Sequence, residues 1–120
     1  MRVAIVVLGD LGRSPRMGNH AIAAAQRGAD VDLVGYHGTR CSAEIEEHPR
    51  IRIWRMRDPL ARFPRRSFPS LARLLWRAVL QHAQLLRVLV FATRRPDRIL
   101  VQCPPALPTL GVAWLAARVR

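Results

Sequence analysis

Short runs of consecutive apolar residues alternate along the chain with longer amphipathic stretches. The runs Arg2–Leu8, Val31–Tyr36 and Arg98–Cys103 are rich in Val, Ile and Leu, which is typical of strands buried on both faces of a parallel sheet. Ile51–Met56 alternates apolar residues with arginine and predicts one more strand.

The first helix is predicted by its start and stop signals as well as by its periodicity. Ser14 and Pro15 suit an N-cap followed by the first helical position. Gly28 supplies a C-terminal stop. The apolar residues between them recur on one helical face: Met17, Ala21, Ala24 and Ala25.

Two further helices are expected in the second half of the chain. Ser70–Arg94 predicts a long helix whose circumference is mostly apolar, and Thr109–Arg120 predicts a final helix, entered through a stiff turn at Pro104–Pro108. The polar positions of the long helix fall on one narrow stripe: Arg73, Arg77, Gln81, Gln84 and Arg87.

The resulting order, β-α-β-β-α-β-α, predicts an α/β fold with a Rossmann-like, mainly parallel sheet and right-handed crossovers. At 120 residues the chain suits one domain and is too short for two. A further strand would be expected after the last helix, so we expect residues 1–120 to form an incomplete domain.

The charge of the chain is +12, and all 20 basic residues are arginine. The absence of lysine favours a compositional bias over selection for phosphate contacts, although a basic surface attracts anionic membranes and phosphorylated ligands. Arginines interrupt the apolar segment Leu71–Ala92, so no membrane span is expected. Cys41 and Cys103 fit no metal or redox spacing, and we expect idle thiols in a reducing cytoplasm, with no metal and no cofactor.

Candidate chemistry gathers in the loop Gly9–Arg16, where the first strand meets the first helix. Ligands of parallel α/β sheets bind at the carboxyl ends of the strands. Free N–H groups at the helix start favour an anion, and Arg13 and Arg16 add forked donors for phosphate. Asp10 either acts in chemistry or stabilises the turn. The pattern is not a dinucleotide fingerprint, and the placement of Asp32 in mid-strand disfavours a dehydrogenase.

Two segments resemble the chitobiosyldiphosphodolichol β-mannosyltransferase family. Val7–Met17, followed by His20 and Ala21, looks like the amino-terminal signature of these enzymes, and Val101–Pro108 resembles their Gln-Asn-Pro-Pro-x-x-Pro segment. Cys103 stands where that segment usually has Asn. We expect no membrane anchor before the first strand, which would favour a bacterial member.

The resemblance implies an inverting GT-B glycosyltransferase that transfers mannose from GDP-mannose to a lipid-diphosphate-linked N-acetylglucosamine acceptor. GT-B enzymes hold the acceptor mostly in the amino-terminal domain and the nucleotide in a carboxy-terminal domain, and we expect residues 1–120 to represent only part of the amino-terminal domain. We therefore expect the chain to be inactive alone.

The resemblance also assigns roles to single residues. Asp10 becomes the first candidate for general base or acceptor-orienting residue, and His20 the second. The expected diphosphate-binding group is Gly12, Arg13, Ser14 and Arg16, and the expected cleft-shaping group is Gln102, Pro104 and Pro105.

Two readings remain open beside this one. Another GT-B enzyme with a different donor and acceptor would share the scaffold. A nucleic-acid-binding module would need exposed aromatic residues among the arginines, whereas the aromatic residues here fall mostly within apolar runs, so no nucleic acid is expected. The arginine-rich segment 57–66 and the apolar helix suit a peripheral protein on the cytoplasmic face of an anionic membrane, or a helix packed within its own domain.

Overall fold

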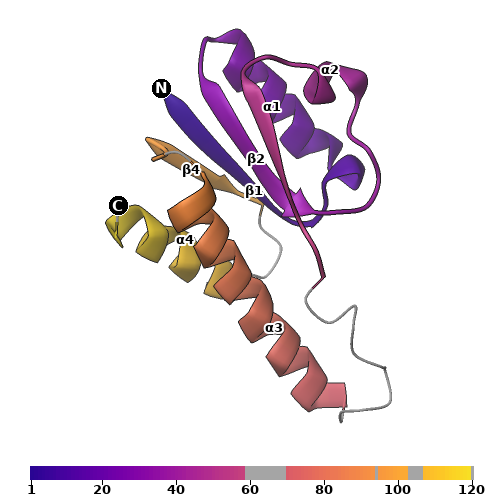
Figure 1. Ribbon diagram of the computed structural model, residues 1–120, viewed down its shortest axis with the longest axis vertical. Coiled ribbons are helices and arrows are strands. Elements are labelled where there is room, and N and C mark those ends of the chain that lie inside the picture. Colours follow the sequence, from indigo (N-terminus) through magenta and orange to yellow (C-terminus); the bar gives the residue numbers. More distant parts are fainter. Residues whose placement is uncertain (59–69, 94, 103–106, 120) are drawn as a thin grey trace.

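The computed structural model describes residues 1–58, 70–93, 95–102 and 107–119 (Figure 1). In these residues, four parallel strands form one sheet in the order β3-β2-β1-β4. The strands are β1 (Arg2–Asp10), β2 (Asp30–Tyr36), β3 (Ile51–Met56) and β4 (Arg98–Val101). The predicted Rossmann-like α/β fold, with the first strand inside the sheet, is confirmed.

Helices cover both faces of the sheet (Figure 1). The helices α1 (Pro15–Gln26) and α2 (Ala43–Glu46) lie on one face, and α3 (Ser70–Arg87) and α4 (Leu107–Val119) on the other. A 3₁₀ turn, η1 (Leu11–Arg13), links β1 to α1, and a π-helical turn, η2 (Val88–Ala92), continues α3. α2 was not predicted, because four residues are too few to show a helical period.

The core consists of two layers separated by the sheet. Alternate β1 side chains point to opposite faces, so Ile5 packs in the layer that contains Met17 and Ala21 of α1. Val6 packs in the other layer, with Leu85 of α3. Burial on both faces explains why β1 is a continuous apolar run.

The predicted limits of α1 are confirmed. α1 begins at Pro15 after Ser14. At its end, the N–H groups of Gly28 and Ala29 donate to the carbonyls of Ala25 and Ala24, at 2.9 and 3.1 Å. Gly28 has φ of +86°, so the helix ends in a Schellman motif that favours glycine.

Three predicted boundaries in the second half were wrong. Regular α-helix ends at Arg87, seven residues before Arg94, because the chain widens into the π-helical turn. α4 begins at Leu107, so Pro108 lies inside its first turn, where proline is tolerated because its missing N–H would have no helical partner. β4 ends at Val101; Cys103 lies outside the described residues.

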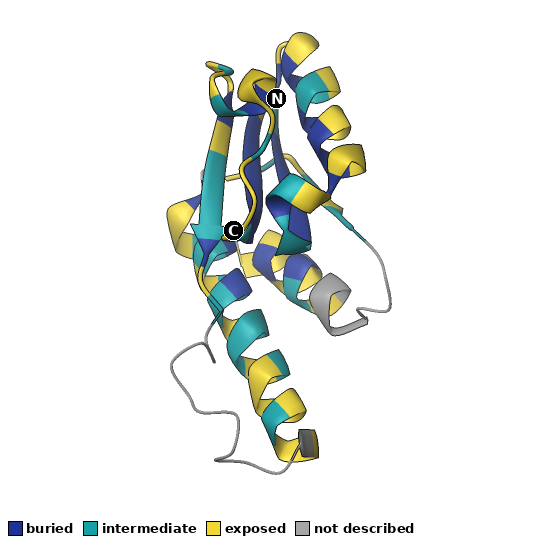
Figure 2. Ribbon diagram, turned by 90° about the vertical axis from the view of Figure 1, so that its right-hand side faces the viewer, coloured by how far each residue is buried: buried dark blue, intermediate teal, exposed yellow. Residues whose placement is uncertain are grey.

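The amino-terminal half of α3 extends beyond the sheet (Figures 1 and 2). Its large apolar side chains are therefore exposed by 50% or more: Leu71, Leu74, Leu75, Trp76 and Val79. We expected no membrane span here, yet by length and composition alone the segment Leu71–Ala92 is long and apolar enough to cross a bilayer. The exposed apolar side chains also form the kind of surface that an amphipathic helix presents to a membrane interface or a protein partner.

Candidate functional site

A groove lies at the carboxyl edge of the sheet, where β1, β2 and β4 end. Asp10, the last residue of β1, pairs in register with Tyr36, the last residue of β2. Gln102 follows β4, and its N–H donates to the carbonyl of Val6 at 3.0 Å. The edge therefore brings together residues that are up to 92 positions apart, as the strand-end rule predicts.

The first part of this carboxyl-edge groove, called here the α1 part, lies beside the start of α1 and has a volume of about 560 Å³. Four of the predicted site residues are among those that line it, whereas Gly12 and Arg16 are not. The lining residues are Val7, Leu8, Gly9, Asp10, Arg13, Ser14, Gln81 and Gln102.

The Asp10 carboxylate connects two loops of the edge. It accepts hydrogen bonds from the N–H and hydroxyl of Thr39, at 2.9 and 2.7 Å, and from the N–H of Gly12 at 3.0 Å. Arg13 lies 3.8 Å away. Hydrogen bonds from the Thr39 N–H and hydroxyl, with smaller contributions from the Gly12 N–H and Arg13, hold the pKa of Asp10 below its ordinary value, although desolvation opposes them. The carboxylate thus fixes the loop and stays ionised.

Two glycines allow these loops to approach each other. A Cβ on Gly12 would lie 2.4 Å from the Thr39 carbonyl oxygen, and one on Gly38 would lie 2.6 Å from the Asp10 carboxylate. Gly12 therefore allows close contact with the loop that contains Thr39. The local sequence around Gly12 does not reveal this role.

Ser14 precedes α1 but its side chain does not cap the helix. Its hydroxyl donates to the Gln102 side-chain oxygen at 2.9 Å. The first N–H groups of α1 therefore receive no cap from Ser14, and they point toward the helix start with a partial positive charge. Arg13 lines the α1 part, and Arg16 is exposed on the first turn of α1, so the helix dipole and two guanidinium groups lie at this end, an arrangement that suits an anion.

The second part of the groove, called here the β2 part, lies between the ends of β2 and β3 and helix α3. The Arg77 guanidinium pairs with the Asp58 carboxylate at 3.1 Å. The Tyr36 hydroxyl is buried and makes no hydrogen bond with any residue that the structure describes; burial raises its pKa to about 12, so it stays neutral. The lining residues are Leu8, Gly9, Asp10, Tyr36, His37, Asp58, Arg77 and Gln81.

Sequence reasoning missed most of the β2 part. Tyr36, His37 and Asp58 follow the second and third strands, so the strand-end rule, applied beyond the first strand, would have found them. Arg77 and Gln81 belong to the polar stripe predicted on the long helix. Its periodicity could not show that the stripe faces the groove.

The other predicted residues do not join the groove. His20 is exposed on α1 and lines neither part. Pro104 and Pro105 lie outside the described residues, as do Arg62, Arg65 and Arg66. Burial raises the pKa of the Cys41 thiol, which fits an unreactive cysteine. Among the residues described, no group of three His, Cys, Asp or Glu side chains is placed to hold a metal ion.

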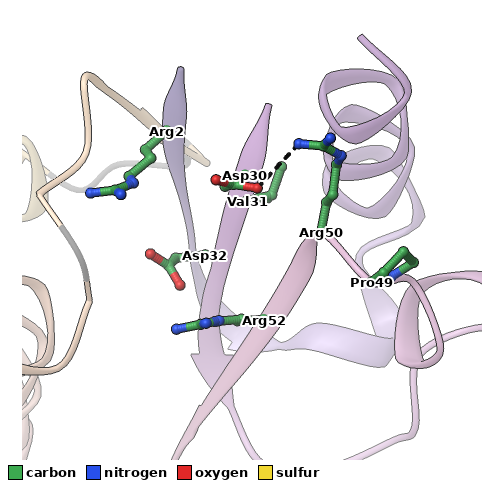
Figure 3. A pocket seen from close by; sticks show the side chains of 7 residues that line it. All are labelled: Arg2, Asp30, Val31, Asp32, Pro49, Arg50 and Arg52. Carbon is green, nitrogen blue, oxygen red and sulfur yellow. Dashed lines mark hydrogen bonds and ion pairs between the residues drawn. The ribbon is translucent and has the colours of Figure 1, made fainter. Parts of the chain in front are cut away.

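A smaller pocket lies at the opposite, amino edge of the sheet (Figure 3). Its charges largely compensate one another: Arg50 binds the Asp30 carboxylate and the Gly28 carbonyl, at 3.4 and 3.1 Å. Asp32 is buried and accepts a hydrogen bond from the Trp54 indole at 2.9 Å. Asp32 therefore supports the sheet at mid-strand, in agreement with the argument against a dehydrogenase.

Several curated glycosyltransferases are similar to this chain over nearly its whole length. It is 41% identical over 120 aligned residues to the UDP-glycosyltransferase TURAN of Arabidopsis thaliana. It is 42% and 37% identical, over 111 and 115 residues, to the chitobiosyldiphosphodolichol β-mannosyltransferases of Yarrowia lipolytica and Homo sapiens. These alignments cover 97%, 92% and 93% of this chain.

The chain spans about a quarter of the length of these relatives, with coverage of 25%, 23% and 23% respectively. No protein-family model and no solved structure matches it. The similarity is therefore carried by sequence identity along nearly the whole of this chain.

Proposed function

The chain is homologous to the chitobiosyldiphosphodolichol β-mannosyltransferases over nearly its whole length, and on this premise we propose that it forms the amino-terminal, acceptor-side part of such a transferase. The proposed reaction moves mannose from GDP-mannose to a lipid-diphosphate-linked N-acetylglucosamine, with inversion to a β linkage. The proposed site is the carboxyl-edge groove, with no metal or other cofactor.

One observation carries the proposal: the hydrogen bond between Ser14 and Gln102 joins the two segments whose sequences resemble this family. They form adjoining walls of the α1 part, next to the uncapped start of α1. A diphosphate carries several anionic oxygens, which helix N–H groups and guanidinium forks bind well.

The chemistry assigned to this edge is a direct displacement. The acceptor hydroxyl attacks the anomeric carbon of mannose and loses its proton to a base, while the bond from that carbon to the GDP diphosphate breaks and GDP leaves. Arg13, Arg16 and the α1 start would bind the diphosphate of either substrate and so offset negative charge. The nucleotide would lie on a second domain, as in GT-B enzymes.

Two residues, Asp10 and His20, are candidates for the general base. Asp10 accepts three kinds of hydrogen bond and has a lowered pKa, which favours the acceptor-orienting role over proton abstraction. His20 lies on the exposed side of α1, so it would reach the acceptor only if substrate extended past the helix start. We assign Asp10 the orienting role and keep His20 as the candidate to be tested.

A second candidate is a GT-B glycosyltransferase that uses a different nucleotide sugar. The similarity to a protein named as a UDP-glycosyltransferase favours it. Competition between GDP-mannose and UDP-sugars for binding to an enzyme that contains both domains distinguishes the two candidates, because only the true donor should bind tightly.

We also propose that the protein lies on the cytoplasmic face of a membrane. The support is the exposed apolar surface of the amino-terminal half of α3, which also carries Arg73, together with the net charge of +12. A lipid-linked acceptor resides at such a surface. Apolar side chains would enter the interface while arginines contact anionic headgroups.

A chimera tests the transferase proposal. In the Yarrowia lipolytica relative, the aligned region would be replaced by this chain, and mannose transfer from GDP-mannose to a chitobiosyl-diphosphate lipid would be measured. Transfer is expected for the chimera and not for this chain alone. A chimera that melts cooperatively and binds GDP but transfers nothing would contradict the proposal.

A further inference from the structure

We infer that the carboxyl-edge groove is divided by charge, and that its β2 part is a binding site for the sugar rings of the acceptor, held by Tyr36, Asp58, Arg77 and Gln81. This inference rests on the proposed function and deepens it, since it assigns the acceptor's diphosphate to the α1 part and its N-acetylhexosamine rings to the β2 part.

The first support is the difference in charge between the two parts. In the β2 part, Arg77 is paired with Asp58 at 3.1 Å, so its positive charge is compensated. In the α1 part, the Arg13 side chain is 83% exposed and only 3.8 Å from a carboxylate that is already hydrogen-bonded to Thr39. An anion would therefore be attracted to the α1 part, whereas the Asp58 carboxylate would repel it from the β2 part.

The second support is the mixture of hydrogen-bonding groups. A phosphate at neutral pH mainly accepts hydrogen bonds, but sugar hydroxyls and N-acetyl groups both donate and accept. The β2 part offers acceptors on Asp58, donors on Arg77, and both on the Gln81 amide. The buried Tyr36 hydroxyl makes no hydrogen bond among the described residues, and buried polar groups normally have a partner.

The third support is continuity. Leu8, Gly9, Asp10 and Gln81 line both parts, so a sugar joined directly to a diphosphate would pass from one part to the other without leaving the groove. Gly9 leaves open space at this junction, since a Cβ there would meet no atom within 4 Å. In a glycosyl diphosphate, an anionic group is followed by neutral sugar rings. Along the edge, the α1 part, which attracts anions, is likewise followed by the β2 part, where the charge of Arg77 is compensated.

Two soluble probes separate the parts. The 120-residue chain, labelled with ¹⁵N, would be titrated with inorganic pyrophosphate and, separately, with N,N′-diacetylchitobiose. Tyr36→Phe and Arg77→Met change residues that line only the β2 part, Arg13→Ala changes the α1 part, and Gln26→Leu on the exposed end of α1 is the matched control. The melting temperature of each variant shows whether it is folded.

We expect Tyr36→Phe and Arg77→Met each to weaken chitobiose binding about tenfold, the effect of one lost hydrogen bond, without changing pyrophosphate binding. Arg13→Ala should do the reverse. Pyrophosphate binding with no chitobiose binding, or equal effects of the Tyr36 and Arg77 variants on both probes, would overturn the inference and leave the proposed function standing. Unchanged chitobiose binding in both variants would also overturn it. If neither probe bound the folded chain, the proposed function itself would fail.

Discussion

The hydroxyl of Ser14 donates a hydrogen bond of 2.9 Å to the side-chain oxygen of Gln102, across 88 positions of sequence. This contact holds the loop after β1 against the segment after β4. Because the Ser14 hydroxyl donates to Gln102, the Ser14 side chain makes no capping hydrogen bond with the first N–H groups of α1. These N–H groups, left without a cap from Ser14, lie beside the groove.

Arg13→Ala should weaken pyrophosphate binding about ten- to hundredfold, because one charge-assisted hydrogen bond contributes about 1.5–3 kcal/mol. Arg27→Ala is the matched control, since it removes the same charge at the opposite, exposed end of α1. Titration followed by NMR measures both affinities. Equal weakening by the two substitutions would mean that only net charge matters and would contradict a local site.

Asp10→Asn should lower the melting temperature at about pH 7, because an amide cannot accept all the hydrogen bonds from Thr39 and Gly12. The folded-state pKa of Asp10 is lowered, so its stabilising effect is present above the ordinary carboxyl value of about 3.9 and is lost as pH falls through the folded-state value.

The difference in melting temperature between wild type and Asp10→Asn should therefore shrink as the pH falls below about 3.9. Glu44→Gln, an exposed carboxylate on α2, is the control and should show little effect throughout. A pH-independent difference for Asp10→Asn would exclude the carboxylate as the anchor. In the chimeric enzyme, a large fall in kcat with unchanged stability would instead assign Asp10 as the base.

Gly12→Ala should destabilise the fold by about 1–3 kcal/mol, the usual cost of forcing an extra methyl group into packed structure. The added Cβ would lie 2.4 Å from a backbone oxygen of Thr39. Gly9→Ala, three residues earlier in an open position, should change stability little. Urea unfolding measures both free energies, and a similar cost for both variants would contradict the loop contact.

Paired substitution of Leu75 and Val79 by glutamine should reduce binding to anionic vesicles about tenfold or more. In the wild type, both exposed apolar side chains would move from water into the membrane interface, and glutamine loses this gain. Val119→Gln, an exposed apolar residue on α4, is the control. Flotation with anionic and neutral vesicles at two salt concentrations measures binding. Vesicle binding that the paired substitution leaves intact would assign this face to a protein partner.

The sequence predicted the sheet well because its physical signals are local. β1 is buried on both faces, so every residue from Val3 to Val7 must be apolar. The limits of α1 were also readable, since Pro15 and Gly28 have backbone requirements that few other residues meet. Burial and backbone conformation at single positions can therefore be predicted directly from the sequence.

The site was predicted only in part, because its key contacts join distant segments. The Asp10 side chain meets Thr39, 29 residues away, and no local pattern distinguishes this contact from a simple turn. Similarly, the stripe on α3 was visible, but whether Arg77 and Gln81 face solvent or the groove depends on how α3 packs on the sheet. His20 was chosen for its nearness in sequence, and its helical position directs it outward.

The most direct test of the central claim, that the carboxyl edge binds a sugar-linked diphosphate, is a residue-resolved NMR titration of the 120-residue chain with inorganic pyrophosphate. The amide shifts should move at Gly9–Met17 and Gln102 and remain unchanged at the opposite edge, around Arg50 and Arg52 (Figure 3). Changes confined to Arg2, Arg50 and Arg52, or no saturable change anywhere, would contradict the assignment of the site.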